Sequence, residues 1–341
     1  MEHRIPVTIL TGYLGSGKTT LLNRILREQH GHRIAVIENE FGETGIDNEI
    51  LLQDNEEQII EMNNGCICCT VRGDLVRILG ELSHKRNAGE LRFDRVVIET
   101  TGLADPAPVA QTFFMNLDIS RDYLLDAVVT VVDAKHANQQ LDANREAQEQ
   151  VGIADRLLIS KTDLVNEEDV HVLARRLAGI NPRARQAQVH FGQTDIADIL
   201  DIRGFSIDAI LDINPQFLDK TNHSHDDAVR SFVYRESRPL NAPRFEALMG
   251  MLTRQYGPQM LRYKGVLNLH GRDCRVVFQG VHMIMGANEG TPWGSEEARE
   301  TTLVFIGRDL PQAIVEEGLR FCLEETIGVS ESSPSINHEQ R

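Results

Sequence analysis

The sequence predicts an α/β fold, in which a phosphate-binding domain with a mostly parallel sheet precedes a smaller α+β domain. Short apolar, β-branched runs alternate with helical patterns up to residue 191. A Gly-x-x-x-x-Gly-Lys-Thr motif lies between the first run and the first helical pattern, where a phosphate loop is expected. Residues 208–227 lose this periodicity and gather Asn, Pro, His and Asp, so a second domain is expected after them.

The first domain is expected to span residues 1–207. Its strand candidates are residues 5–10, 33–38, 95–99, 126–133, 156–160 and 186–191. Their alternation with helices is the pattern of a mostly parallel sheet that is covered by helices on both faces.

The second domain is expected over residues 228–328, after a linker at residues 208–227. Its expected strands are residues 229–234, 262–269, 275–281 and 301–306, and its expected helices are residues 244–255 and 311–323. This is a split βαβ-like order, with a turn around Gly271. Trp293, the only tryptophan, is expected to seal a small core rather than to dock another protein. The polar residues 329–341 are expected to be disordered.

Residues Gly12 to Thr19 form the predicted phosphate loop. Its glycines let successive backbone N–H groups converge on phosphates, and the dipole of the following helix adds positive potential. Lys18 is expected to reach the β- and γ-phosphates, and Thr19 to offer its hydroxyl to Mg²⁺. A chance glycine-rich turn is the alternative, which the flanking strand and helix disfavour. The predicted nucleotide contacts here are Gly12, Gly15, Ser16, Gly17, Lys18, Thr19 and Thr20.

The base is predicted from the end of another strand. Lys161 and Asp163 follow the strand candidate at 156–160. An Asp carboxylate can accept two hydrogen bonds from a guanine edge but none from adenine, and a lysine stem can cover the face of the base. Such a pair also occurs by chance on solvated loops. Because ligands of open α/β sheets bind at the carboxyl ends of the strands, we expect GTP.

The strand candidate at 95–99 delivers the third nucleotide element. The Glu99 carboxylate can hold the water shell of Mg²⁺, and the Gly102 N–H can meet a γ-phosphate oxygen. The next residue, Leu103, is apolar and cannot orient an attacking water, so we expect slow GTP hydrolysis by the isolated protein. The predicted catalytic residues are Lys18, Thr19 and Glu99.

Composition limits the expected partners. The 341 residues include 51 acidic and 35 basic side chains, for a net charge of −16, without any Lys/Arg-rich block. Such a surface disfavours nucleic acid and anionic membranes. No apolar run is long enough to span a bilayer, and the first ten residues do not resemble a secretory signal, so a cytoplasmic protein is expected.

Three cysteines form the second site signal. Cys66, Cys68 and Cys69 precede a helical pattern with apolar residues at 75, 78, 79 and 82, and the positive end of a helix dipole favours thiolate. Three thiolates can bind one Zn²⁺ or Cu(I), and an incomplete ligand shell suits transfer better than permanent structure. A redox pair of Cys66 and Cys69, or inert residues in a turn, are the alternatives. Cys274 and Cys322 are expected to be apolar fillers.

Glu38 and Glu43 lie in an acidic segment that follows the strand candidate at 33–38. In a phosphate-loop GTPase, the segment after the second strand is commonly ordered by Mg²⁺ and the γ-phosphate. Either carboxylate can therefore touch a metal in one nucleotide state and not in the other. A solvated acidic loop is the alternative.

Five segments occur in a fixed order along the chain. They read GYLGSGKT at 12–19, ENEFGE at 38–43, NGCICC at 64–69, ETTGLADP at 99–106 and SKTD at 160–163. Together they closely resemble the CobW/YjiA-type GTPases, a metallochaperone group within the phosphate-loop class. The resemblance runs through residues 6–205 and resumes over 261–323, and the Cys-x-Cys-Cys segment is its most specific part.

The resemblance implies a GTPase domain, a smaller α+β domain, GTP hydrolysis with Mg²⁺, and Zn²⁺ carried on a cysteine loop to client apo-metalloproteins. Matched by motif, the implied metal ligands are Cys66, Cys68, Cys69, Glu38 and Glu43.

Two departures from this family concern accessory metal sites. The long His-rich loop of many relatives shrinks to residues 223–227, which keep His223 and His225. Asn116 stands where such chains tend to carry a histidine. Both departures put an accessory metal site, including one built on His190, in doubt.

Three classes of function stay open. The leading hypothesis is a GTP-driven zinc chaperone. A second is a GTPase that delivers another metal or a cobalamin-type cofactor, and a third is a metal sensor or store whose affinity GTP tunes. The expected partners are GTP, GDP and client apo-metalloproteins. The client, the physiological metal and the oligomeric state are not specified by the sequence.

Overall fold

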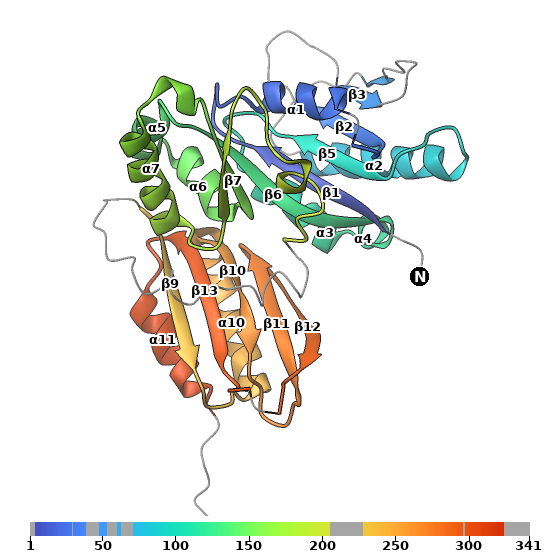
Figure 1. Cartoon of the computed structure of the whole chain (residues 1–341). Helices are drawn as coiled ribbons and strands as arrows, with labels where there is room; N and C mark the ends of the chain where they lie inside the picture. Colours follow the sequence, from blue (N-terminus) through green and yellow to red (C-terminus); the bar gives the residue numbers. More distant parts are fainter. Residues whose placement is uncertain are drawn as a thin grey trace, which may run out of the picture.

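The computed structural model describes residues 4–28, 30–38, 48–52, 60–62, 71–204, 228–295 and 297–323. These residues form an eight-stranded and a five-stranded sheet, drawn in Figure 1 with the N-terminal sheet above the C-terminal one. The predicted α/β class, with a smaller α+β part that follows a mostly parallel sheet, is confirmed.

The first sheet has six parallel strands in the order β2-β5-β1-β6-β7-β8, which correspond to the six predicted ones. Two antiparallel strands, β3 and β4, extend the edge at β2. They were not predicted, because both are short and interrupted by acidic residues. The strands are β1 (Ile5–Thr11), β2 (Ile34–Glu38), β3 (Asn48–Leu52), β4 (Ile60–Met62), β5 (Arg95–Glu99), β6 (Tyr123–Asp133), β7 (Arg156–Ser160) and β8 (Arg185–Val189).

Helices cover both faces of this sheet. Ile5, Val7 and Ile9 of β1 pack into the apolar core on the side of α2, α3 and α4, whereas Leu10 packs on the side of α1. This alternation follows from the two-residue period of a strand. The helices are α1 (Lys18–Arg27), α2 (Val71–Asn87), α3 (Ala107–Met115), α4 (Leu117–Asp122), α5 (Ala137–Ala143), α6 (Arg145–Ile153) and α7 (Glu167–Ile180), with short 3-10 turns at Thr162–Leu164 and Ile196–Asp198.

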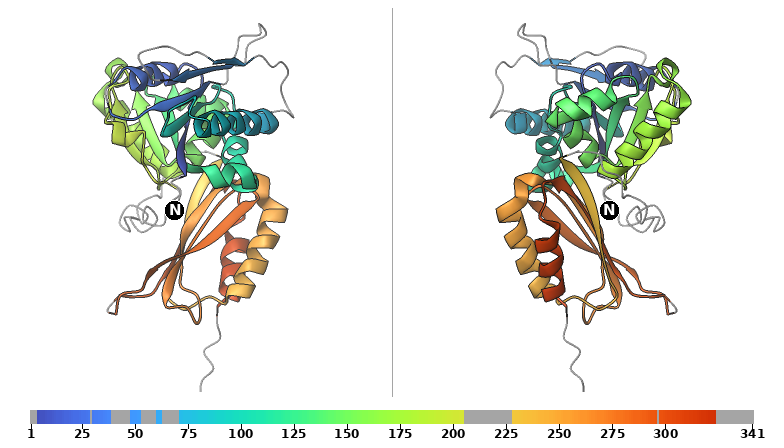
Figure 2. Two further views of the ribbon diagram at one scale, coloured as in Figure 1. Left: turned by 90° about the vertical axis from the view of Figure 1, so that its right-hand side faces the viewer. Right: turned by 90° about the vertical axis from the view of Figure 1, so that its left-hand side faces the viewer.

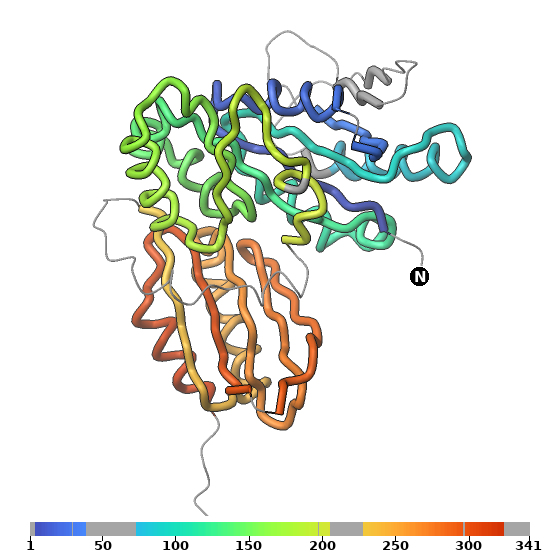
Figure 3. Tube along the Cα trace, in the orientation of Figure 1, coloured from blue at the N-terminus to red at the C-terminus, as the bar shows by residue number. Residues whose placement is uncertain are grey.

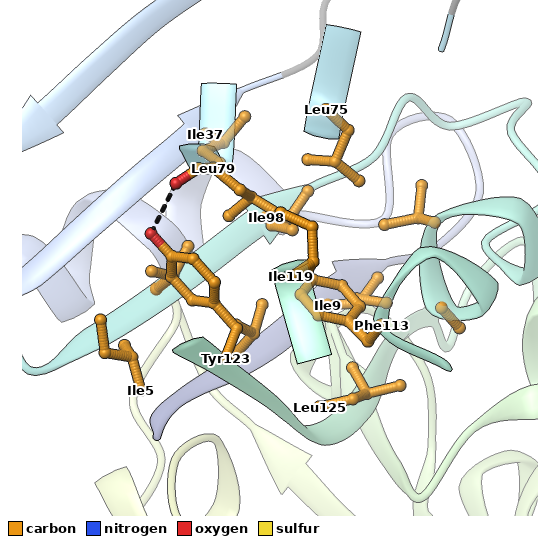
Figure 4. Packing of buried hydrophobic residues seen from close by; sticks show 14 of the residues in the cluster. Ile5, Ile9, Ile37, Leu75, Leu79, Ile98, Phe113, Ile119, Tyr123 and Leu125 are labelled. Atoms are coloured by element: carbon orange, nitrogen blue, oxygen red, sulfur yellow. Dashed lines mark hydrogen bonds between the residues drawn. The ribbon is translucent and has the colours of Figure 1, made fainter. Parts of the chain in front are cut away.

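Helix α2 confirms the helical pattern predicted after the three cysteines. Its four spaced apolar residues, at 75, 78, 79 and 82, are all buried. Figure 4 shows Leu75 and Leu79 among the side chains of this core, where the hydroxyl of Tyr123 donates a hydrogen bond to the carbonyl oxygen of Leu79 at 2.8 Å. Because Tyr123 is 1% exposed, this bond satisfies a polar atom that would otherwise be buried without a partner.

The second sheet is antiparallel, in the order β12-β11-β10-β13-β9. Helix α10 connects β9 to β10, and β13 lies between these two strands in the sheet. The predicted split βαβ order is therefore confirmed. Helices α10 and α11 pack on one face of the sheet (Figure 2). The elements are β9 (Val229–Glu236), α10 (Ala242–Tyr256), a 3-10 turn (Gly257–Gln259), β10 (Met260–Leu267), β11 (Cys274–Val281), β12 (Ile284–Pro292), β13 (Thr301–Arg308) and α11 (Gln312–Phe321).

Strand β12 was not predicted. It is an edge strand whose residues are mostly exposed and include two glycines, so it lacks the apolar run from which strands are predicted. It ends beside Trp293, which packs on Val266 and Val277, with the guanidinium of Arg275 4.6 Å from the centre of its ring. Trp293 thus seals a small core, as predicted.

A buried charge cluster joins the two sheets. The ends of β9, β10 and β13 lie against α6 (Figure 3). Beside them, Asp155 Oδ1 pairs with Arg262 Nη2 at 2.9 Å and lies 3.9 Å from Lys264 Nζ. Burial lowers the pKa of Arg262, an effect that Asp155 partly offsets. Burial also places the pKa of Lys264 well below its usual value. The Asp155 carboxylate therefore favours the charged forms of two basic groups that the interface has removed from water.

The predicted division into residues 1–207, 208–227, 228–328 and 329–341 stays a prediction, because residues 205–227 and 324–341 lie outside the described residues. Among the helices that the structure describes, none has the length and hydropathy that a bilayer crossing requires.

Replacing Asp155 tests the role of the charge cluster in stability. We expect Asp155→Asn to lower the free energy of unfolding by about 3–5 kcal/mol, because it leaves Arg262 and Lys264 buried without their shared carboxylate. Denaturant unfolding measures this. The control is Arg272→Gln, which breaks the exposed pair with Glu289 and should cost less than about 1 kcal/mol. Equal effects of the two variants would contradict the prediction.

Candidate nucleotide and metal site

The phosphate loop lies between the end of β1 and the start of α1, where the sequence predicts it. Gly12 has a φ of 143° and Gly17 a φ of 101°. A Cβ on Gly12 would lie 2.3 Å from the carbonyl oxygen of Val131 in β6, so glycine alone allows this approach to the sheet. The first turn of α1 carries no acidic residue, so its positive dipole end is not opposed there.

Lys18 folds its ammonium group back over this loop. Its Nζ donates to the carbonyl oxygens of Gly12 and Tyr13 at 2.8 and 3.5 Å. Burial lowers the pKa of Lys18, and the negative charge of Glu99 partly opposes that shift. A partly desolvated ammonium is stabilised more by an anionic phosphate oxygen than by neutral carbonyl oxygens. This environment suits the predicted role of Lys18 at the β- and γ-phosphates.

Thr19 and Glu99 face each other at the ends of the loop and of β5. Thr19 Oγ1 donates to Glu99 Oε1 at 3.2 Å. Hydroxyl and carboxylate oxygens are hard ligands of the kind that Mg²⁺ takes, so the donors present fit this ion. The register of β2 and β5 places Glu38 directly opposite Glu99, and the two predicted metal-binding carboxylates therefore belong to neighbouring strand ends.

The segment after β5 lies against the phosphate loop. A Cβ on Gly102 would lie 2.7 Å from the backbone nitrogen of Leu14. The Thr100 N–H donates to the carbonyl oxygen of Leu10 at 2.9 Å, and its hydroxyl to Thr11 Oγ1 at 2.8 Å. These bonds hold Gly102 beside the loop that would cradle the phosphates. The side chain of Leu103 is apolar and 55% exposed, so it brings no polar group to this position.

Lys161 and Asp163 follow β7, at the same edge of the sheet. Lys161 has a φ of 56°, and its Nζ donates to the carbonyl oxygen of Gly15 at 2.6 Å and to Asp133 Oδ2 at 2.7 Å. Its aliphatic stem thus spans from β7 to the phosphate loop, from where it can cover one face of a base. Asp163 lies in the 3-10 turn Thr162–Leu164 with its side chain 31% exposed, so its oxygens are open to a ligand.

Other predicted contacts are brought to the same place. Ser16 is buried, and its carbonyl oxygen accepts a hydrogen bond from Ser160 Oγ at 2.6 Å, which ties the phosphate loop to β7. Thr20 is exposed on α1, directly after Thr19. The structure therefore gathers the nucleotide residues predicted at Gly12, Gly15, Ser16, Gly17, Lys18, Thr19, Thr20, Glu99, Gly102, Lys161 and Asp163 along one edge of the sheet.

Asp133 was not predicted as a site residue. It ends β6, is 1% exposed and accepts from Lys161, while His136 Nδ1 lies 2.9 Å from its Oδ2. Burial by itself raises the pKa of Asp133, but the hydrogen bonds from Lys161, His136 and the Lys135 backbone outweigh it, and the net shift is downward. The ionised carboxylate anchors Lys161. Its signal in the sequence was its place at the end of an apolar strand at the ligand-binding edge.

The predicted thiolate ligands Cys66, Cys68 and Cys69 lie outside the described residues. The same holds for Glu43, His223 and His225. In the described parts of the chain, no group of three or more His, Cys, Asp or Glu side chains is placed to hold a metal ion. Cys322 packs in the core of the second sheet as predicted, where burial raises the pKa of its thiol.

His190 lies at the nucleotide edge of the sheet. Its Nδ1 is 3.7 Å from Asp163 Oδ1, so it neighbours the predicted guanine contact. Together with the absence of a ligand cluster among the described residues, this placement gives no support to a separate metal site on His190.

A phosphate loop, an acidic strand end and a Lys-x-Asp turn along one edge of a parallel sheet define the class of phosphate-loop nucleotide-binding proteins. Residues 6–188 match the family described as CobW/HypB/UreG, nucleotide-binding domain, and residues 229–323 match the cobalamin synthesis protein cobW C-terminal domain. The chain belongs to this family, and the resemblance predicted from its motifs is confirmed.

Two relatives, one of them also with a solved structure, span nearly the whole chain. It is 42% identical over 309 residues to the zinc chaperone YjiA of Escherichia coli (strain K12), covering 90% of this chain and 95% of the relative. It is 31% identical over 392 residues to the zinc-regulated GTPase metalloprotein activator 1 of Dictyostelium discoideum, covering 94% and 80%. The crystal structure of Zn(II)-bound YjiA GTPase from E. coli superposes with a TM-score of 0.76 at 38% identity, covering 94% and 100%.

Asp163→Asn tests the predicted choice of base. The variant should bind GTP about 5–150-fold more weakly, because an amide cannot accept both guanine donors and one of them stays unpaired at about 1–3 kcal/mol. Competition against a fluorescent guanine nucleotide measures this. The control is Asp169→Asn, which changes an exposed carboxylate in the first turn of α7 and should leave affinity unchanged. If ATP competes as well as GTP for the unaltered protein, the assignment is wrong.

Proposed function

We propose that this protein is a GTP-hydrolysing zinc chaperone that carries Zn²⁺ on Cys66, Cys68 and Cys69 and transfers it to client apo-metalloproteins in a GTP-dependent step. The names of its relatives, a zinc chaperone and a zinc-regulated GTPase, support this proposal. The zinc-bound YjiA structure of the same fold supports it as well.

In this proposal the edge of the first sheet binds GTP and hydrolyses it to GDP and phosphate. Thr19, whose hydroxyl oxygen lies 3.2 Å from Glu99, would give that hydroxyl to Mg²⁺, and Glu99 would hold the water shell of the ion. Lys18 would neutralise charge on the β- and γ-phosphates. The Gly102 N–H meets the γ-phosphate, while Lys161 and Asp163 recognise guanine. Because Leu103 supplies no group that orients water, the isolated protein turns over slowly.

One observation carries the link between the nucleotide and the zinc: the β2–β5 register sets Glu38 opposite Glu99. The acidic segment that begins at Glu38 therefore starts beside the proposed Mg²⁺ position. The same stretch of chain continues through β3 and β4 to the cysteines and ends at Val71, the first residue of α2. In this proposal Glu38 and Glu43 are additional zinc ligands. A change in the Mg²⁺ and phosphate contacts of Glu99 can therefore move the neighbouring Glu38 and the segment that contains Glu43.

The proposal includes a cytoplasmic setting, since thiolate ligands need a reducing compartment. It also includes the division into a GTPase domain at 1–207, a linker at 208–227, a second domain at 228–328 and a tail at 329–341. Two functions compete with this proposal: delivery of another metal or of a cobalamin-type cofactor, and a metal sensor or store whose affinity GTP tunes. The metal found in the purified protein, together with metal competition, distinguishes a zinc chaperone from a protein that delivers another metal or cofactor.

Zinc binding by the three cysteines can be tested directly. The triple variant Cys66→Ser, Cys68→Ser, Cys69→Ser should lose the high-affinity zinc site, whereas Cys274→Ser, a half-buried free thiol in β11, should retain it. Because zinc binds thiolates, uptake by the unaltered protein releases protons, and affinity falls as the pH drops below the thiol pKa values. Chelator competition and calorimetry in buffers of different ionisation enthalpy measure both. Unchanged stoichiometry and affinity in the triple variant would falsify the site.

Zinc affinity should also depend on the nucleotide. A GTP-driven chaperone requires that zinc affinity differ between the GDP state and the state with a non-hydrolysable GTP analogue. By linkage, zinc must then change the relative affinity for the two nucleotides by the same factor, typically about 5–150-fold. Chelator competition in each state gives the ratio, and GTP turnover should rise when an apo-client is added. Equal zinc affinities in both states would leave a GTPase and a zinc site that merely share one chain.

A further inference from the structure

Helix α6 lies between the two sheets and is buried although it is polar. Every residue from Ala147 to Ile153 is buried. Three of them in succession, Gln148, Glu149 and Gln150, carry polar side chains. Most buried polar groups form hydrogen bonds, so the partners of these three side chains show what the helix connects. Gln150 Oε1 has no hydrogen-bond partner among the described residues, so the connection made by Gln150 runs through its Nε2.

Gln150 contacts the segment that follows β5. Its Nε2 donates to the carbonyl oxygens of Gly102 and Ala104 at 3.1 and 3.0 Å. On the backbone side, the carbonyl oxygen of Gln150 accepts from Thr130 Oγ1 in β6 at 2.8 Å. Gln150 is 1% exposed, so few other arrangements are open to its side chain. It therefore holds in place the segment that the proposed function assigns to the γ-phosphate.

Gln148 and Glu149 contact the second sheet. Gln148 Oε1 accepts from the N–H of Val229, the first residue of β9, at 3.2 Å. Glu149 Oε1 lies 3.8 Å from Arg308 Nη2, at the end of β13, and also accepts from Arg145 Nε. Strands β9 and β13 pair with each other. The same helical turn thus binds the segment after β5 on one side and two paired strands of the second sheet on the other.

A second contact joins the same two parts. Asp105, at the end of the segment after β5, accepts from the N–H of Ala107 in α3 at 2.9 Å through Oδ1, and its Oδ2 lies 4.0 Å from His282 Nε2. His282 forms the turn between β11 and β12 with a φ of 51°, and its N–H donates to the carbonyl oxygen of Met260 at 2.9 Å. The segment after β5 therefore lies within ion-pair range of the second sheet, without a hydrogen bond to His282 Nε2, in addition to its connection through α6.

Packing around these contacts leaves little room for independent movement. A Cβ on Gly152 of α6 would lie 2.8 Å from Leu261 Cδ1 in β10, and one on Gly102 would lie 2.7 Å from Leu14. Close-packed interiors transmit displacements rather than absorb them. A shift of Gly102 must therefore break the hydrogen bonds of Gln150 or move α6 against the second sheet.

We propose that α6 couples the nucleotide state to the C-terminal sheet. Gln150 is the positioning residue for Gly102, Gln148 and Glu149 connect the helix to β9 and β13, and the contact between Asp105 and His282 is a second connection. The C-terminal sheet thereby changes its contacts with the first sheet between the GTP and GDP states, and changes at these contacts shift the relative affinity for the two nucleotides. This inference rests on the proposed binding of GTP and GDP but not on zinc.

The test compares nucleotide affinities of the full chain. For each variant, the affinity ratio of a non-hydrolysable GTP analogue to GDP is measured by competition with a fluorescent nucleotide. His282→Gln and Arg308→Gln, both on the C-terminal sheet, should change this ratio about 5-fold or more, the lower range of coupled sites. The matched control is Arg272→Gln, at the opposite end of β11 from His282, which should leave it unchanged.

A second measurement uses amide hydrogen exchange in β9 and β13. Exchange in the unaltered protein should differ between the two nucleotides, and this difference should disappear in Gln150→Met. Equal weakening of both nucleotides, or an unchanged ratio together with nucleotide-independent exchange, would overturn the coupling and leave the proposed GTPase intact. Failure of the unaltered protein to bind either nucleotide would instead remove the proposed function and this inference with it.

Discussion

The approach of the phosphate loop to β6 is the constraint on which the nucleotide edge depends. At Gly12 the loop backbone lies so close to the carbonyl oxygen of Val131 that a Cβ would overlap it. Held there, the loop offers the carbonyl oxygens of Gly15 and Ser16 to Lys161 and Ser160. The loop that follows β1 is thus fixed to β6 and β7, and a small error in either strand would misplace the groups proposed to meet phosphate and base.

Buried charge is handled differently at the two ends of this fold. At the nucleotide edge, Asp133 is kept ionised by donors that outweigh its burial, and it fixes Lys161, the lysine proposed to cover the base. At the interface between the sheets, burial lowers the pKa of Arg262 and Lys264, and the Asp155 carboxylate partly offsets this by pairing with Arg262 and lying 3.9 Å from Lys264. The first arrangement leaves its lysine stem open to a ligand, whereas the second holds two sheets together.

The proposed chaperone has two routes by which a nucleotide can act on the rest of the chain. One leads from Glu99 to Glu38 across the β2–β5 register and on toward the cysteines. The other leads from Gly102 through Gln150 and α6 to the C-terminal sheet. The two routes begin at Glu99 and Gly102, three residues apart at the end of β5, so in the proposed function one hydrolysis event can act on both the metal site and the C-terminal sheet.

The sequence by itself determined the six parallel strands, the phosphate loop and the split βαβ order, because apolar periodicity and glycine spacing are local signals. It missed β3, β4 and β12, whose short or exposed runs are strands only through pairing with a neighbour. It also missed Asp133 and Gln150. Their partners, Lys161 and Gly102, lie 28 and 48 residues away along the chain, so only the tertiary structure brings them together. Once these side chains are buried, a hydrogen bond to a nearby partner replaces the lost contact with water.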